Sequence, residues 1–173
     1  MINYLTGDAT DPQVPGNKII AHVCNDIGAW GRGFVLSLSK RWPKSEESYR
    51  RWYQEQGEDD YPPMMLGQVV FVPVKGADSD VCVANMIGQH GIKFKDDGTP
   101  PVRYGAIEEC LRQVEQWARD WDHASVHMPR IGCGLAGGVW SEIEPIINRV
   151  FTDIEVYVYD FNTGDARTIP WSK

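Results

Sequence analysis

The fold is decided by residues 18–41, which read KIIAHVCNDIGAWGRGFVLSLSKR. The first seven positions are almost continuously apolar, as is typical of a central strand that is covered on both faces. A glycine-rich loop at Gly28–Gly33 follows, and a helical pattern then runs from Phe34 to Arg41. A strand that leads through a glycine-rich loop into a helix indicates an α/β domain.

The same alternation of strand and helix patterns continues along the rest of the chain. Further strands are expected at residues 2–5, 68–74, 81–87, 125–128 and 154–159. Helices are expected at 34–41, 45–56, 103–121 and 141–151, the last with a capping box of Ser141 and Glu144. Pro73 either weakens its strand or places it at a sheet edge, and a turn at 75–80 follows it. We therefore predict a three-layer α/β/α fold around a central mixed sheet of about six strands.

Length and charge limit the class of protein. The 173 residues fit one domain at 1–173, with a core at about 1–161 and a short tail at 162–173. A net charge of −7 argues against nonspecific duplex binding, which needs a clustered basic surface. No apolar run reaches the roughly 20 residues of a membrane span, and the N-terminus lacks a signal-peptide pattern. We expect a cytoplasmic monomer without nucleic-acid or membrane partners.

The four cysteines give no sign of metal or thiol chemistry. Cys24, Cys82, Cys110 and Cys133 lie far apart and form no C-x-x-C pair, so a zinc site of the usual spacing is not expected. A phosphatase loop of the C-x₅-R type is also missing, because Trp30 and Val139 stand where the arginine would be. We predict no metal, and a thiol nucleophile is disfavoured.

Two glycine-rich loops carry the candidate chemistry. The first is Gly28–Gly33, and the second, Gly132–Gly138, lies between the strand near Met128 and the helix at Ser141. Glycine lets a backbone approach a ligand closely, and the helix behind such a loop presents unpaired N–H groups. Two loops at the carboxyl ends of central strands favour a diphosphate site over two simple tight turns.

Two other phosphate-binding patterns fit less well. Gly132, Gly134 and Gly137 match G-x-G-x-x-G, and Asp160 lies about twenty residues further on, as in a dinucleotide-binding fingerprint. That match lies too close to the end of the sequence for the second half of such a sheet, and it gives the first loop no role. Neither loop is followed by the Gly-Lys-Ser/Thr of a Walker A motif.

Two stretches together resemble the macrodomain family of ADP-ribose-binding proteins. They are HVCNDIGAWGRGFVLSLSKRWPKSEESY, residues 22–49, and MPRIGCGLAGGVW, residues 128–140. The resemblance extends to about Phe161 and is strongest to the ADP-ribose 1″-phosphate phosphatases and the terminal ADP-ribose glycohydrolases. It implies a macrodomain-like fold, no cofactor, and ADP-ribose or a mono-ADP-ribosylated protein as the ligand.

The resemblance also implies a binding role for particular residues. Asp8, beside Ala9, would accept a hydrogen bond from the adenine amino group, and Asn25 would reach the terminal ribose. Phe161, or less favourably Tyr159, would pack on the adenine. The two loops would hold the terminal ribose and the diphosphate through Gly28, Ala29, Trp30, Gly31, Arg32, Gly33, Phe34, Ile131, Gly132, Cys133, Gly134, Leu135, Ala136, Gly137 and Gly138.

The chain departs from the glycohydrolase pattern at two positions. That branch is expected to use a lysine and an aspartate, and the counterparts here are Gln89 and Ala136, so a lysine-adduct mechanism is in doubt. Our hypothesis is a metal-free hydrolysis of a phosphate or carboxylate ester at C1″ of the terminal ribose. The candidates for catalysis are Asn25, Asp26, His22, Gln89 and His90.

Within this hypothesis, Asn25 orients the ribose while Asp26, His22 or His90 acts on water. His22 lies in the middle of a strand and is also compatible with a buried structural role. Two other functions stay open. A protein that binds ADP-ribose without turnover would keep the same loops, and a module that stacks on single-stranded nucleic acid would use the many aromatic residues.

Overall fold

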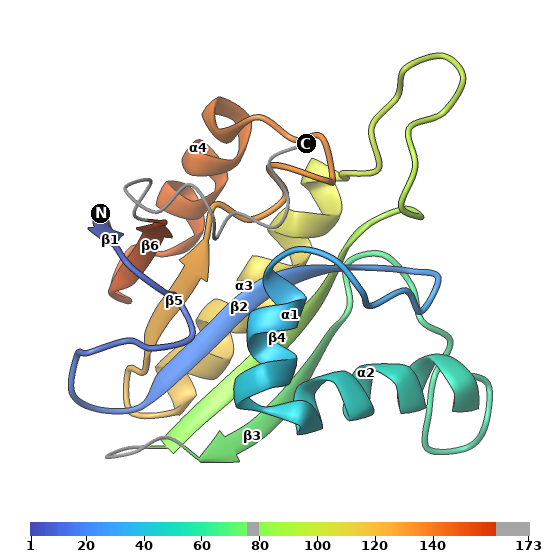
Figure 1. Cartoon of the computed structure of the whole chain (residues 1–173). Helices are drawn as coiled ribbons and strands as arrows, with labels where there is room; N and C mark the ends of the chain where they lie inside the picture. The colour runs from blue at the N-terminus through green and yellow to red at the C-terminus, as the bar shows by residue number, and fades with distance from the viewer. Residues whose placement is uncertain (76–79, 162–173) are drawn as a thin grey trace.

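Six strands form one mixed sheet with the order β1-β6-β5-β2-β4-β3. The structure, a computed structural model, describes residues 1–75 and 80–161 (Figure 1). The strands are β1 (Ile2–Thr6), β2 (Lys18–Asn25), β3 (Val69–Lys75), β4 (Asp80–Gln89), β5 (Ser125–Pro129) and β6 (Val156–Asp160). Neighbouring strands run parallel, except that β3 and β4 are antiparallel. The predicted mixed sheet is thus confirmed, and Pro73 lies in the edge strand β3.

Helices cover both faces of the sheet and make the three layers that the sequence predicts. They are α1 (Phe34–Arg41), α2 (Pro43–Glu55), α3 (Tyr104–Asp120) and α4 (Trp140–Val150). In Figure 1, α1 and α2 lie on one side of the sheet and α3 and α4 on the other. Strand β4 contributes to both cores because its side chains alternate between the two faces of the sheet. Val83 packs on the side of α1 and α2, whereas Ala84 packs on the side of α3 and α4.

Helix α1 has the predicted boundaries, whereas those of α2, α3 and α4 differ from the prediction by one or two residues. Helix α2 begins at Pro43, because proline fits the first turn of a helix. Helix α4 begins at Trp140, with Val139 as its N-cap and no side-chain capping bond. The predicted capping box of Ser141 and Glu144 is therefore wrong, and Glu144 instead contacts the Tyr4 hydroxyl.

Two predicted features lie at least partly outside the described residues, namely the turn at 75–80 and the tail at 162–173. Within the described part, no helix is both long and apolar enough to cross a membrane. The carboxyl ends of β2, β4, β5 and β6 meet at one edge of the sheet, because these strands run in the same direction. Both glycine-rich loops leave the sheet at that edge, where α/β proteins commonly bind ligands.

Candidate functional site

A pocket of about 880 Å³ lies across the carboxyl ends of β6, β5, β2 and β4. These four neighbouring strand ends span three strand spacings, or about 14 Å. The pocket is lined by His22, Val23, Cys24, Asn25, Ala29, Trp30, Gly31, Arg32, Gly33, Phe34, Val35, Arg50, Gln89, Ile92, Lys93, Pro129, Arg130, Ile131, Gly132, Cys133, Gly134, Leu135, Ala136, Tyr159, Asp160 and Phe161. This span suits an elongated ligand that lies across the ends of the four strands.

Most of the site residues predicted from sequence lie in these walls. Both loops contribute, as do Asn25 and Gln89 at one end and Tyr159 and Phe161 at the other. The predicted residues that the walls do not include are Asp8, Ala9, Asp26, Gly28, His90, Gly137 and Gly138. Four of these, namely Asp26, Gly28, His90 and Gly137, are each next in sequence to a wall residue, so they border the pocket rather than line it.

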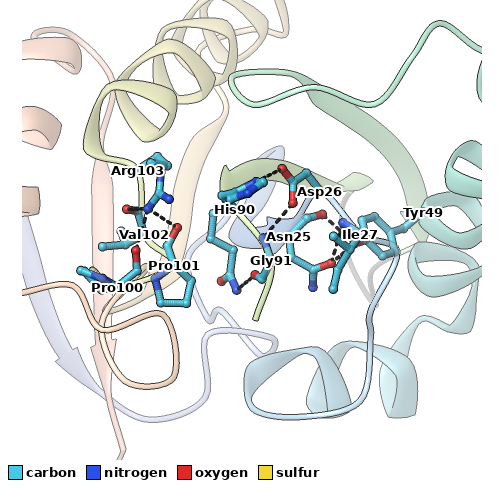
Figure 2. Close-up of polar contacts among 11 residues, drawn as sticks. Asn25, Asp26, Ile27, Tyr49, His90, Gly91, Pro100, Pro101, Val102 and Arg103 are labelled. Atoms are coloured by element: carbon cyan, nitrogen blue, oxygen red, sulfur yellow. Dashed lines mark hydrogen bonds and ion pairs between the residues drawn. The ribbon is translucent and has the colours of Figure 1, made fainter. Parts of the chain in front are cut away.

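The first loop is shaped by the side chain of Asn25 at the end of β2. Its Oδ1 accepts the backbone N–H groups of Ile27 and Ala29 at 3.1 and 3.0 Å, and its Nδ2 donates to the Ala29 carbonyl at 2.6 Å. The buried Tyr49 hydroxyl of α2 lies 2.7 Å from the Asn25 carbonyl oxygen and 2.9 Å from Oδ1 (Figure 2). Burial raises the pKa of Tyr49, which keeps this hydroxyl a donor.

Helices α1 and α2 hold the middle of the first loop through Trp30. The Trp30 indole N–H donates to Ser39 Oγ at 2.7 Å, and Ser39 donates to Glu46 at 2.7 Å. Arg50 closes this circle of hydrogen bonds, because it donates to Glu46 at 2.8 Å and to the Trp30 carbonyl at 2.9 Å. Hydrogen bonds from α1 and α2 thus hold both the backbone and the side chain of Trp30.

The second loop is a series of tight turns held by its own backbone and by the segment before α3. Gly138 N–H donates to the Gly132 carbonyl at 2.8 Å, and Val102 N–H donates to the Ala136 carbonyl at 3.0 Å. A Cβ placed at Gly33 would lie 3.8 Å from Leu135, so the two loops approach each other across the pocket. Residues of both glycine-rich loops therefore face each other within the pocket.

The β6 end of the pocket combines aromatic side chains with a fixed ion pair. Arg130 donates two hydrogen bonds to Asp160, at 2.6 and 2.8 Å, which lowers the pKa of Asp160. Tyr159 and Phe161 flank Asp160 on the wall. The exposed Asp8 does not join them: its Oδ1 accepts the N–H and hydroxyl of Thr10 at 2.8 and 2.9 Å. Its contact with an adenine stays a prediction.

His22 lines the pocket but is almost fully buried, and it belongs to a polar network in the adjacent core. Its Nε2 contacts Asn85 Oδ1, and Asn85 in turn donates to the Ser45 carbonyl at 3.0 Å. Burial lowers the pKa of His22 to about 4, although the Asn85 bond opposes the shift. The ring is 2% exposed and packs edge-on against Trp30. This geometry favours the structural role for His22 over the activation of water.

Asp26 and His90 meet at the rim, although 64 positions separate them in sequence. His90 Nδ1 lies 2.7 Å from Asp26 Oδ2, and the Gly91 N–H donates to Asp26 Oδ1 at 2.8 Å (Figure 2). Gln89 lies in the wall beside them, and its Nε2 donates to the Gly91 carbonyl at 2.9 Å. The sequence proposed Asp26 and His90 as separate candidates and gave no sign that they form a pair.

Sequence reasoning missed several wall residues. Ile92 and Lys93 lie in the loop after β4, which carries no recognisable motif, and Arg50 lies on α2. Arg130 directly precedes the predicted Ile131, so its position in the quoted MPRIGCG run could have indicated it. Among residues 1–75 and 80–161, no group of three or more His, Cys, Asp or Glu side chains could hold a metal ion.

Comparisons with known proteins agree with this architecture. A macrodomain protein from Streptomyces coelicolor is 49% identical, with a TM-score of 0.78 over 94% of this chain and 100% of that chain. An ADP-ribose 1″-phosphate phosphatase of Lodderomyces elongisporus is 24% identical over 92% of this chain and 99% of that protein. The mouse chromodomain-helicase-DNA-binding protein 1-like is 30% identical over 96% of this chain, which spans only 18% of that protein. No family model matches the sequence.

The fold and the pocket define an α/β protein with an elongated site at the carboxyl edge of a mixed sheet. The near-complete overlap with the Streptomyces coelicolor protein, at 49% identity, then identifies the family. The chain belongs to the macrodomain family.

Proposed function

We propose that this macrodomain binds ADP-ribose and hydrolyses an ester at C1″ of its terminal ribose, with phosphate or a protein carboxylate as the leaving group. The observation that carries the proposal is the pocket itself, which spans four strand ends and has both glycine-rich loops in its walls. The phosphatase relative, which matches nearly end to end, supports this substrate class.

The pocket offers a suitable environment for each part of ADP-ribose. Phe161 and Tyr159 at the β6 end provide aromatic surface for a purine. The backbone of the two loops faces the middle, and α1 begins behind the first loop without a side-chain cap at Gly33, so its first N–H groups suit a diphosphate. Asn25 and Gln89 at the other end supply amides for the hydroxyl groups of the terminal ribose.

The chemistry that these residues support is positioning rather than covalent catalysis. The resemblance implies that Gln89 and Ala136 replace the lysine and the aspartate of the glycohydrolase branch, and neither side chain is a nucleophile. An ester at C1″ already carries a good leaving group, so fixing it beside a water molecule supplies much of the rate. The loop N–H groups stabilise negative charge on the departing group.

Calorimetric titration of ADP-ribose, with ADP and NAD as controls, tests the binding. We expect ADP-ribose to bind at least tenfold more tightly than ADP, which corresponds to about 1.4 kcal/mol, because only ADP-ribose fills the Asn25 end. Turnover of ADP-ribose 1″-phosphate and of glutamate-linked ADP-ribosyl protein in the same preparation tests the hydrolysis. Binding without turnover would make the protein a reader, which the replaced lysine and aspartate favour. Failure to bind ADP-ribose would contradict the whole proposal.

A further inference from the structure

Parallel pairing explains why Asp26 and His90 meet. Strands β2 and β4 are neighbours, and Asn25 pairs with Gln89 at their carboxyl ends. The next residues along the two strands are Asp26 and His90, so the register that brings two wall residues together also joins this pair at the rim. Neither residue lines the pocket, yet each directly follows one that does.

The contacts around Asp26 fix the orientation of the His90 ring. The Asp26 side chain is only 15% exposed, and the Gly91 N–H holds its Oδ1 at 2.8 Å. The other oxygen, Oδ2, lies 2.7 Å from His90 Nδ1. Because an ionised carboxylate only accepts hydrogen bonds, Nδ1 carries the hydrogen and Nε2 of a neutral ring is left with a lone pair.

His90 directly follows Gln89, which lies in the pocket wall at the end of β4. The His90 side chain is 56% exposed, so solvent water can reach the ring. The His90 backbone N–H donates to the Pro101 carbonyl at 2.8 Å, so His90 is bonded to the segment that precedes α3. The other charged groups close to these contacts in sequence are Lys93 and Arg103, and Arg103 turns its guanidinium to the carbonyls of Pro100, Pro101 and Val102 (Figure 2).

We propose that His90 is the general base of the hydrolysis and that Asp26 is its positioning residue; this inference rests on the proposed function. His90 Nε2 removes a proton from water, and the water oxygen forms a bond to C1″. The bond between C1″ and the ester oxygen breaks, and its electron pair leaves with the carboxylate or phosphate. The proton then passes from the imidazolium to solvent, while Asp26 stabilises that imidazolium as it forms.

The substitutions His90→Asn and Asp26→Asn test the pair. Asparagine at 90 keeps an N–H toward Asp26 but lacks the base, so kcat should fall roughly 100-fold or more. Asparagine at 26 presents an N–H to Nδ1 and forces the ring hydrogen onto Nε2, so kcat should fall at least about tenfold. Because neither residue lines the pocket, the ADP-ribose affinity of both variants should stay within about threefold of the wild-type value.

A matched control is the exposed His123 in the turn between α3 and β5, away from the carboxyl edge of the sheet. His123→Asn should leave kcat unchanged, and asparagine tolerates the positive φ of 53° at that position. Protonation of a catalytic base makes kcat fall toward acid pH. The wild-type protein should show this fall, and the residual activity of H90N should not.

Nitrogen NMR of the histidine rings gives a readout besides activity. We expect the Nδ1–H tautomer at His90 in the wild-type protein and the Nε2–H tautomer in D26N. An active wild-type enzyme with an equally active H90N, or an Nε2–H tautomer in the wild-type protein, overturns this inference alone. A wild-type protein that binds ADP-ribose but turns nothing over contradicts the proposed hydrolysis, and this inference with it.

Discussion

The carboxamide of Asn25 determines the path of the first loop. It bonds with the backbone of Ile27 and Ala29, and the Tyr49 hydroxyl approaches its Oδ1 from α2. One N–H of the amide is used for Ala29, which leaves the second for a ligand. We therefore expect the loss of this side chain to weaken ADP-ribose binding as well as turnover.

Tyr49→Phe tests that arrangement without touching the pocket wall. The substitution removes the hydroxyl that meets the buried Asn25 carbonyl, so the free energy of unfolding should fall by about 1–3 kcal/mol. ADP-ribose affinity should fall as well, because the loop loses its anchor. Urea unfolding and calorimetry measure the two effects. Tyr53→Phe is the control, because it removes a hydroxyl but keeps the aromatic ring next to Gly28. Unchanged stability and affinity in Y49F would contradict the prediction.

The first glycine-rich loop depends on the backbone freedom of Gly28. Its φ is +72°, and a Cβ at this position would overlap the ring of Tyr53. Gly28→Ala should therefore lower the free energy of unfolding by about 1–3 kcal/mol and distort the pocket. Gly31→Ala is the matched control in the same loop, because a Cβ there meets no atom within 4 Å. Equal thermal and urea stability of the two variants would show that a Cβ at position 28 causes no strain.

Local patterns predict the strands, the helices and the two loops of this chain well. Apolar runs such as Ile19–Ala21 and the periodicity of α3 follow from burial on one or two faces, which sequence records directly. The Asp26–His90 pair and the wall residues Ile92 and Lys93 depend on which strands become neighbours and in what register. That information lies in the long-range pairing of β2 with β4, so no short window of sequence contains it.

The two faces of the sheet differ in the polarity of their buried side chains. The core under α3 and α4 is almost wholly apolar, whereas the face toward α1 and α2 also carries buried polar groups such as His22 and Asn85. Those polar groups lie beneath the first loop, and His127 on the same face of β5 contacts Tyr159 of the pocket wall at 2.9 Å. The stability of the whole domain and the shape of its pocket are therefore linked through buried histidines.

That link predicts how stability depends on pH. Burial lowers the pKa of His22 to about 4 and that of His127 to about 3, whereas an unfolded histidine titrates near about 6.5. Between these values the unfolded chain binds more protons, so the stabilisation is complete above about pH 6.5 and is lost as the pH falls, by about 1.4 kcal/mol per pH unit for each histidine.

Urea unfolding should therefore show a loss of about 4 kcal/mol between pH 7 and pH 5, before the carboxylates titrate. His22→Gln keeps an N–H for Asn85 but has no proton to gain, so it should reduce that loss to about half. Each histidine acts through its own proton uptake, so the remaining half belongs to His127. A free energy of unfolding that stays constant between pH 6.5 and pH 5 would mean that neither ring is neutral and buried in the folded protein.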